Sequence, residues 1–207
     1  MELNARGPLE NVYAKKECIF EVSPHDTHTK QFLYDSLHNY PLTYGHTAYG
    51  GSNDNQQFFG RIFYWSHWVD SFTLSTLPHG VYYALHWAMN EGPKYIHSTA
   101  KAHGIQRIVL NGQTPNQHPT IHYDDVDDVT KWSFIYYITT GDENNGGTAI
   151  YNNALEEKLF HECKYQQGKW LIFPSCYTHQ ALPSIEKWRM SLNIVIHLDA
   201  PQNHMIM

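Results

Sequence analysis

Six short β-rich segments follow one another between residues 105 and 198, and they constrain the fold more than any other feature of the chain. They are rich in β-branched and aromatic residues, and clusters of Gly, Asn, Pro and Asp separate them. The segments are IQRIVLN, WSFIYYITT, GTAIYNN, KLFHECKY, KWLIFPS and RMSLNIVIHL. Between them, GDENNGG and YQQGK are typical of hairpin connections. This spacing predicts an antiparallel β-sandwich or jelly roll of about seven or eight strands.

The first half of the chain predicts helices that support this sheet, after a short strand at 17–22. In the stretch SPHD, Ser23 suits a helix cap, Pro24 the first helical position and Asp26 the acid of a capping box. A second helix is predicted around 80–90, and a short third helix to about residue 103. The expected fold is therefore α+β and mostly β, a double-stranded β-helix (jelly roll) with supporting N-terminal helices.

The length of 207 residues fits one domain. We expect a single domain over 1–207, composed of a helical and β support region (1–104), a jelly-roll core (105–198) and a tail (199–207). The three cysteines form no C-x-x-C pair, and we find neither a signal peptide nor a long apolar run. We expect a cytoplasmic protein without a membrane partner.

The charge balance disfavours nucleic acid as a partner. The formal net charge is -6, and only 14 Lys and Arg residues are present to build a basic groove. The partners that we expect are instead small-molecule or peptide substrates.

The stretch TIHYDDVDDV contains an H-x-D pattern, His122-Tyr123-Asp124. If it is a strand, His122 and Asp124 share one face and provide two metal ligands. A site with two histidines and one carboxylate needs a further imidazole, which His179 can supply from the end of the apolar strand WLIFP. Arg189 lies inside a later apolar β-run, and a buried arginine is costly unless it meets an anion.

A second H-x-D occurs at His197 and Asp199, near the end of the chain. No basic residue follows it, and only His204 is available as a further imidazole. We therefore interpret His197 as a strand-end histidine beside an exposed carboxylate. The three acidic residues that follow the first H-x-D are interpreted as a solvated rim; they are Asp125, Asp127 and Asp128.

The ordered set of H-x-D, Gly146-Gly147-Thr148, a distant histidine and R-x-S resembles the iron(II)- and 2-oxoglutarate-dependent oxygenases, most of all the prolyl-4-hydroxylase-like branch. The match covers about residues 105–198. The resemblance implies that the iron ligands and catalytic residues are His122, Asp124 and His179. It also implies a 2-oxoglutarate site at Arg189, Ser191 and Tyr137, with Asn111 or Gln113 in place of a tyrosine that many members carry.

By this resemblance, the chain would use Fe(II), 2-oxoglutarate and O2, with ascorbate as a further candidate. It would hydroxylate an unactivated C–H bond with release of succinate and CO2, as a prolyl-4-hydroxylase-like protein or an amino-acid hydroxylase. Substrate-determining residues are expected around 44–68 and 78–97. The alternative is a nonenzymatic or zinc-binding jelly-roll (cupin-like) protein. Zinc hydrolysis would leave Arg189 and Tyr137 without a role, and a nonenzymatic protein would make the ordered motif a coincidence.

Overall fold

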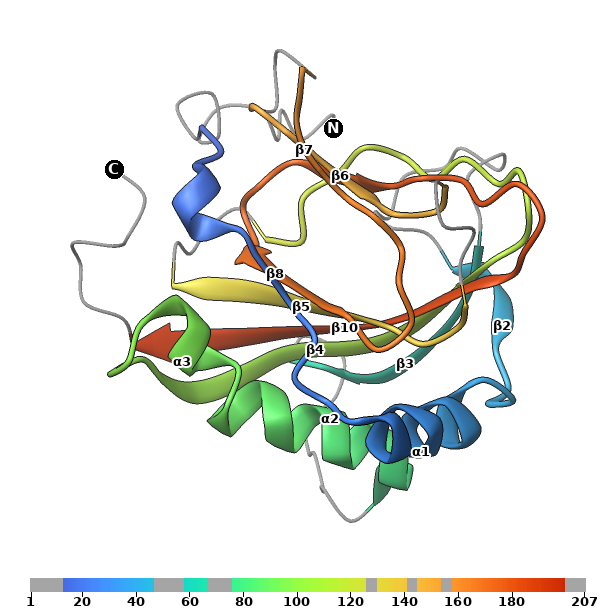
Figure 1. The fold of residues 1–207 in the computed structure, drawn as a ribbon, viewed down its shortest axis with the longest axis horizontal. Helices are drawn as coiled ribbons and strands as arrows, with labels where there is room; N and C mark the ends of the chain where they lie inside the picture. Colours follow the sequence, from blue (N-terminus) through green and yellow to red (C-terminus); the bar gives the residue numbers. More distant parts are fainter. Residues whose placement is uncertain are drawn as a thin grey trace.

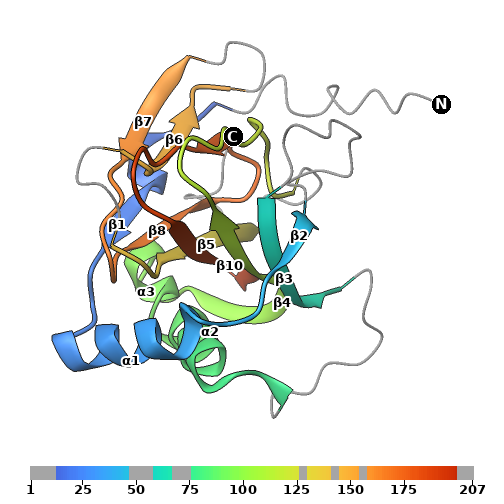
Figure 2. The ribbon, with the colours of Figure 1, turned by 90° about the vertical axis from the view of Figure 1, so that its right-hand side faces the viewer.

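The structure is a computed structural model, which describes residues 13–46, 58–66, 76–125, 130–140, 145–153 and 158–199. Two antiparallel sheets form two layers (Figures 1 and 2). The large sheet has the order β1-β8-β5-β10-β4-β3-β2, and the small sheet has the order β7-β6-β9. The strands are β1 Phe20–Val22, β2 Thr43–His46, β3 Phe58–Trp65, β4 Lys101–Gln113, β5 Lys131–Tyr137, β6 Thr148–Tyr151, β7 Leu159–Cys163, β8 Trp170–Pro174, β9 His179–Ala181 and β10 Arg189–Asp199.

The predicted jelly roll is confirmed, but two predicted connections are wrong. GDENNGG follows β5 and precedes β6, and YQQGK lies between β7 and β8. In both cases the two strands belong to different sheets, so neither segment closes a hairpin. Gly- and Asn-rich segments specify that the chain turns, whereas strand pairing is decided by which apolar faces can be buried together.

The helices lie against the large sheet, on the side away from the small one (Figure 1). They are α1 Thr27–Leu37, α2 His79–Asn90 and α3 Pro93–Ile96. Asp26, rather than the predicted Ser23, caps α1, because its carboxylate accepts a hydrogen bond of 2.7 Å from the Thr29 backbone N–H. The helix predicted to reach residue 103 ends at Ile96, because β4 starts at Lys101. The strand predicted at 17–22 is shortened by a 3-10 turn, Lys16–Cys18.

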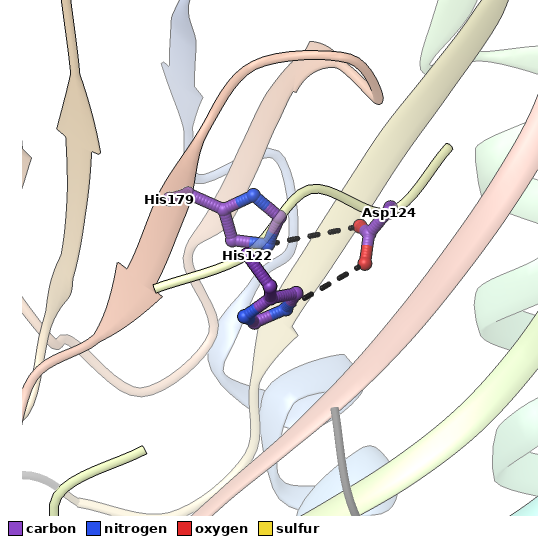
Figure 3. A group of neighbouring side chains, drawn as sticks. All are labelled: His122, Asp124 and His179. Atoms are coloured by element: carbon purple, nitrogen blue, oxygen red, sulfur yellow. Dashed lines mark ion pairs between the residues drawn. The ribbon is translucent and has the colours of Figure 1, made fainter. Parts of the chain in front are cut away.

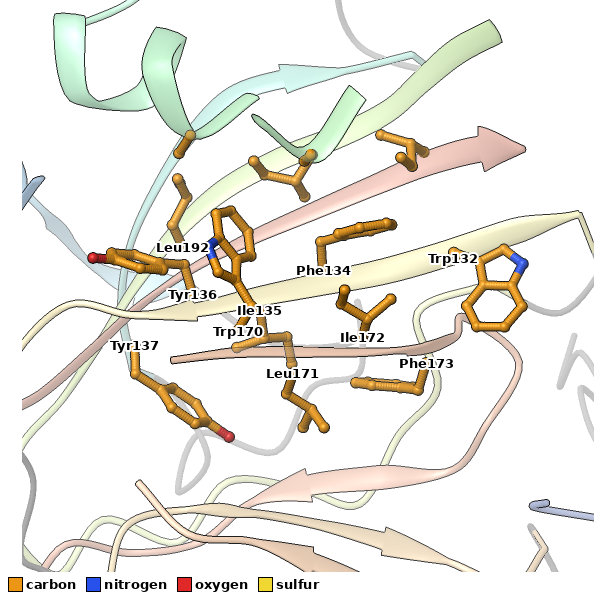
Figure 4. Close-up of a cluster of buried hydrophobic side chains, with 14 of the residues drawn as sticks. Trp132, Phe134, Ile135, Tyr136, Tyr137, Trp170, Leu171, Ile172, Phe173 and Leu192 are labelled. Atoms are coloured by element: carbon orange, nitrogen blue, oxygen red, sulfur yellow. The ribbon is translucent and has the colours of Figure 1, made fainter. Parts of the chain in front are cut away.

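The two faces of the large sheet carry different side chains. Along β5, Phe134 and Tyr136 point to the helical side, and Tyr137 points the other way (Figure 4). Trp170 of β8 packs against Tyr136 with ring centroids 4.9 Å apart, and it stacks on Trp87 of α2 at 4.6 Å. This outer face is therefore an apolar core beneath the helices.

The inner face, which looks toward the small sheet, is partly polar. Ser191 on β10 lies between Asn111 on β4 and Tyr137 on β5 in the strand register. The same alternation brings further polar side chains to this face of the central strands; they are Arg107, Gln113, Ser133, Arg189 and Asn193.

Within the described residues, no helix combines the length and apolar character that crossing a membrane requires.

Candidate metal centre

Three ligand-type side chains meet between the two sheets. The ligand atoms of His122, Asp124 and His179 all lie within 4.8 Å of one another (Figure 3). Nε2 of His122 is 3.9 Å from Oδ1 of Asp124, and Nε2 of His179 is 3.8 Å from Oδ2. Among the residues that the structure describes, this is the one group with metal-ligand geometry.

The second H-x-D copy does not join a group of this kind in the described part of the chain. Asp199 is exposed at the end of β10, and its carboxylate lies 3.3 Å from Nδ1 of His103. The interpretation of His197 as a strand-end histidine beside an exposed carboxylate agrees with this arrangement.

A single pair of backbone hydrogen bonds positions the two histidines. The backbone N–H of His122 donates to the carbonyl of His179 at 2.9 Å, and that of His179 donates to the carbonyl of His122 at 2.7 Å. This contact is an isolated bridge rather than the strand that the H-x-D pattern predicted. Asp124 follows in a bend, where its backbone N–H donates to the Ser175 carbonyl at 3.0 Å. The side chains thus converge without a regular strand.

The outer nitrogen of each imidazole contacts a backbone carbonyl. Nδ1 of His122 lies 2.9 Å from the Thr120 oxygen, and Nδ1 of His179 lies 2.9 Å from the Tyr177 oxygen. When Nδ1 carries the proton, Nε2 presents its lone pair toward Asp124, which is the tautomer that metal binding at Nε2 requires. Burial and the nearby His179 lower the pKa of His122 to about 4, so this imidazole is neutral at pH 7.

The Asp124 carboxylate is fully buried and is the centre of a hydrogen-bond network. Its Oδ1 pairs with Nη2 of Arg107. Its Oδ2 accepts hydrogen bonds from Ser133 Oγ at 2.6 Å and from Asn193 Nδ2 at 3.1 Å. Burial alone would raise the pKa of Asp124, but Arg107 and the two histidines hold it well below its ordinary value. The carboxylate is therefore charged and oriented.

Sequence reasoning missed Arg107, Ser133 and Asn193 as parts of this centre. Each is a polar residue at an inward position of an otherwise apolar β-run. That signal identified Arg189, and it applies equally to Arg107 in IQRIVLN. The contacts themselves depend on strands distant in sequence, which no local pattern reveals.

Arg189 lies buried on the same inner face and meets only neutral oxygens among its described hydrogen bonds. Its Nε donates to the Gly146 carbonyl at 2.6 Å, and its Nη1 donates to Gln113 Oε1 at 2.8 Å. Weaker contacts reach Ser191 Oγ at 3.4 Å and Thr148 Oγ1 at 3.3 Å. The guanidinium is thus held in place by uncharged groups, and its positive charge has no acidic partner in the described part of the chain.

The two glycines beside Arg189 are required by the backbone. Gly146 has a φ of 81°, which favours glycine. A Cβ on Gly147 would lie 2.0 Å from the Cys163 carbonyl oxygen, so no larger residue fits. The Gly146-Gly147 pair therefore allows a close backbone approach that aims carbonyl groups at Arg189.

The remaining predicted residues surround Arg189 in different ways. Gln113 supports the guanidinium directly, whereas Asn111 has a buried Oδ1 without a partner in the described part of the chain. The Tyr137 hydroxyl donates to Thr148 Oγ1 at 2.8 Å, and the Arg189 guanidinium carbon lies 5.6 Å from the Tyr137 ring centre. Tyr165, which sequence reasoning missed, lies at 5.3 Å on the same cation. Its only sequence signal is its position as the first residue of the YQQGK segment.

The predicted acidic rim is only partly described. Asp125 is not solvated as predicted, because its carboxylate pairs with Lys131 Nζ at 2.8 Å and only 13% of its side chain is exposed. Asp127 and Asp128 lie outside the described residues.

No family model matches this chain, and no significant match exists among the curated proteins. Solved structures do match. A Pseudomonas putida prolyl-4-hydroxylase has a TM-score of 0.61 at 13% identity, with 87% of this chain and 92% of that chain covered. A prolyl hydroxylase from Trichoplax adhaerens, in complex with a hypoxia inducible factor peptide fragment, has a TM-score of 0.61 at 11% identity, with 88% and 84% covered.

A third match has a different chemistry in its name. The non-heme alpha ketoglutarate dependent carbocyclase SnoK from nogalamycin biosynthesis has a TM-score of 0.58 at 10% identity, with 89% of this chain and 84% of that chain covered. At these identities the likeness establishes the fold, which is the jelly roll of 2-oxoglutarate–Fe(II) oxygenases.

Proposed function

We propose that this protein, which shares the fold of the 2-oxoglutarate–Fe(II) oxygenases, is an Fe(II)- and 2-oxoglutarate-dependent dioxygenase. It would hydroxylate an unactivated C–H bond with release of succinate and CO2. The observation that carries the proposal is the presence, between the two sheets, of a two-histidine, one-carboxylate cluster and a buried arginine that contacts only neutral oxygens.

The donor set fits Fe(II). Two imidazoles and one carboxylate would hold the ion and would leave it free to bind further ligands, as in non-haem iron oxygenases. His122 and His179 would bind through Nε2, and their Nδ1 contacts with backbone carbonyls would hold both rings in the ligating tautomer. Ser133 and Asn193 would keep the Asp124 carboxylate oriented. The bound iron would supply the activation of O2 that no protein side chain can perform.

Arg189 fits the distal carboxylate of 2-oxoglutarate. A guanidinium bonded to neutral oxygens keeps its full charge for an anion, and its planar fork matches a carboxylate. Ser191 would add a hydroxyl and Tyr137 a ring wall, while the unpartnered Oδ1 of Asn111 would face a polar group or water. The zinc-binding and nonenzymatic alternatives leave this buried charge without a counter-ion, so we favour the oxygenase.

The experiment is anaerobic addition of Fe(II) and 2-oxoglutarate to the purified metal-free protein. We expect a weak visible charge-transfer band and, after admission of air, release of succinate. His179→Ala removes one ligand and should abolish both signals. His197→Ala, which changes the histidine of the second H-x-D, is the matched control and should keep both. A wild-type protein without the band, or a band that survives in His179→Ala, would overturn the proposal.

A further inference from the structure

The candidate site contains a second buried arginine, Arg107, which the proposed reaction does not use. Arg107 and Arg189 lie on adjacent antiparallel strands, and Arg189 pairs in register with Gln113 of β4. At about 3.3 Å per residue, the Gln113 and Arg107 backbone positions are about 20 Å apart. The two arginines therefore serve different parts of the inner face, with Arg107 at the metal cluster.

The surroundings of Arg107 leave much of its guanidinium unused. Its Nη2 bonds Asp124, and its guanidinium carbon lies 5.3 Å from the ring centre of Trp65. Its Nε is buried and has no hydrogen-bond partner in the described part of the chain. Buried donors without a partner are rare in folded proteins, and each costs stability unless a ligand satisfies it.

Metal binding would change the charge balance at Arg107. In the metal-free protein, Asp124 is its counter-ion. In the proposed loaded state, the metal ion is matched by Asp124 and by one carboxylate of 2-oxoglutarate, and Arg189 is matched by the other carboxylate. Arg107 is then the one described cation of this site whose charge lacks a counter-ion of its own. An uncompensated buried charge is unfavourable, so this position attracts an anion.

Arg107 and His122 are the two side chains of the cluster that are partly exposed. The side chains of His122 and Arg107 are 15% and 11% exposed, whereas those of Asp124 and His179 are 0% and 3% exposed. The Arg107 side chain is therefore partly accessible to a solute, whereas that of Asp124 is not.

We propose that Arg107 anchors a carboxylate group of the substrate, so that the enzyme acts on a small carboxylic acid; this inference rests on the proposed function. The Nε–H and the remaining Nη–H groups would bind the carboxylate, and Trp65 would form an adjacent wall. Asn193 donates to Asp124 through Nδ2 and has a buried Oδ1 without a partner in the described part of the chain. That oxygen would accept a hydrogen bond from an amino or hydroxyl group next to the carboxylate, as in a free amino acid or hydroxy acid.

The test is a binding measurement that needs no turnover. The protein is loaded with Zn(II) and 2-oxoglutarate and titrated with free L-amino acids in a calorimeter. The carboxamide of each amino acid, which lacks the carboxylate charge, is the matched control. We expect at least one acid to bind about 10-fold or more tightly than its amide, because a hydrogen bond to a charged group contributes that much. If no acid binds better than its amide, including the case in which none binds, the inference is overturned.

Variants test whether Arg107 is the source of the preference for the acid over the amide. Arg107→Gln should reduce the affinity for the acid to that for the amide, and Arg107→Lys should keep the preference with weaker binding because lysine lacks the planar fork. Arg61→Gln, which removes the same charge at an exposed position of β3, is the control and should bind like the wild type. Retention of the full preference in Arg107→Gln would overturn the inference. If Arg107→Gln no longer binds Zn(II), Arg107→Lys decides, and unweakened acid binding in that variant counts against the anchor.

Failure of this inference is distinguishable from failure of the proposed function. Binding of 2-oxoglutarate to the Zn(II) protein is measured first. If 2-oxoglutarate does not bind, the proposed function fails. If it binds and the acids show no preference over the amides, only the role of Arg107 fails, and a neutral or peptide substrate is favoured.

Discussion

The two faces of the large sheet are built from the same strands, but the outer face is an apolar core and the inner face is partly polar. On the outer face, Phe134, Tyr136 and Trp170 pack under α2 in an apolar core (Figure 4). On the inner face, Ser133 of β5 bonds the Asp124 carboxylate of the candidate metal centre, and Arg189 of β10 lies in a second polar cluster beside Gly146. The difference shows how a strand can contribute stability and chemistry at once, because its side chains alternate.

The largest combined effect on metal binding and stability is expected for Asp124→Ala, on the inner side of the large sheet. The variant should lose metal binding and turnover completely. It should also lower the unfolding free energy of the metal-free protein by about 3–5 kcal/mol, because it leaves Arg107 buried without its partner. Calorimetry and chemical denaturation measure the two effects. Glu91→Ala, which breaks the exposed pair with Lys94, is the control and should cost about 1 kcal/mol or less.

A substitution on the outer face should lower the stability of the protein without changing its metal affinity. Phe134→Ala removes a fully buried ring and should lower the unfolding free energy by about 3–5 kcal/mol. Metal affinity, measured at a temperature where the variant is folded, should remain that of the wild type. A large loss of metal affinity in the folded variant would mean that the two faces are not independent.

A substitution that keeps the positive charge at position 189 tests whether 2-oxoglutarate binding depends on the shape of the guanidinium group. Arg189→Lys keeps the cation but cannot reproduce the fork that contacts Gly146 and Gln113. We expect the dissociation constant for 2-oxoglutarate to rise by about 10-fold or more, the effect of losing one hydrogen bond to a charged group. Unchanged 2-oxoglutarate affinity in this variant would argue against Arg189 as the anchor.

The last effect concerns pH, and one histidine on each side of the large sheet contributes to it. The pKa of His122 on the inner face is lowered to about 4 by burial and by His179. The pKa of His25, which accepts a 3.0 Å hydrogen bond from Trp170 on the outer face, is also lowered, mainly by burial. Between the ordinary value near 6.5 and these lower values, the unfolded chain binds more protons than the folded protein.

The stability of the metal-free protein should therefore fall as the pH decreases from about 6.5 toward 4. Denaturation curves at several pH values measure the slope. His122→Ala should lose the inner contribution and keep that of His25. A slope that is identical in the wild type and in His122→Ala would contradict the assignment to the inner face.

Much of the architecture could be predicted from local patterns. The β-rich segments predicted the jelly roll, and the helices at 80–90 and after SPHD exist, although Asp26 rather than Ser23 caps the first. The hairpins assigned to GDENNGG and YQQGK were wrong, because each segment joins two sheets. Turn chemistry is local, whereas the choice of a pairing partner depends on burial across the whole domain.

The sequence by itself determined which residue types are available to the site: the candidate ligands His122, Asp124 and His179, and an arginine inside an apolar run at Arg189. Only the tertiary structure decided their neighbours, above all the contact of Asp124 with Arg107. Ligand types and strand alternation are properties of a few consecutive residues. A contact between side chains of a bend and a distant strand depends on register and layer packing, which are set by the fold as a whole.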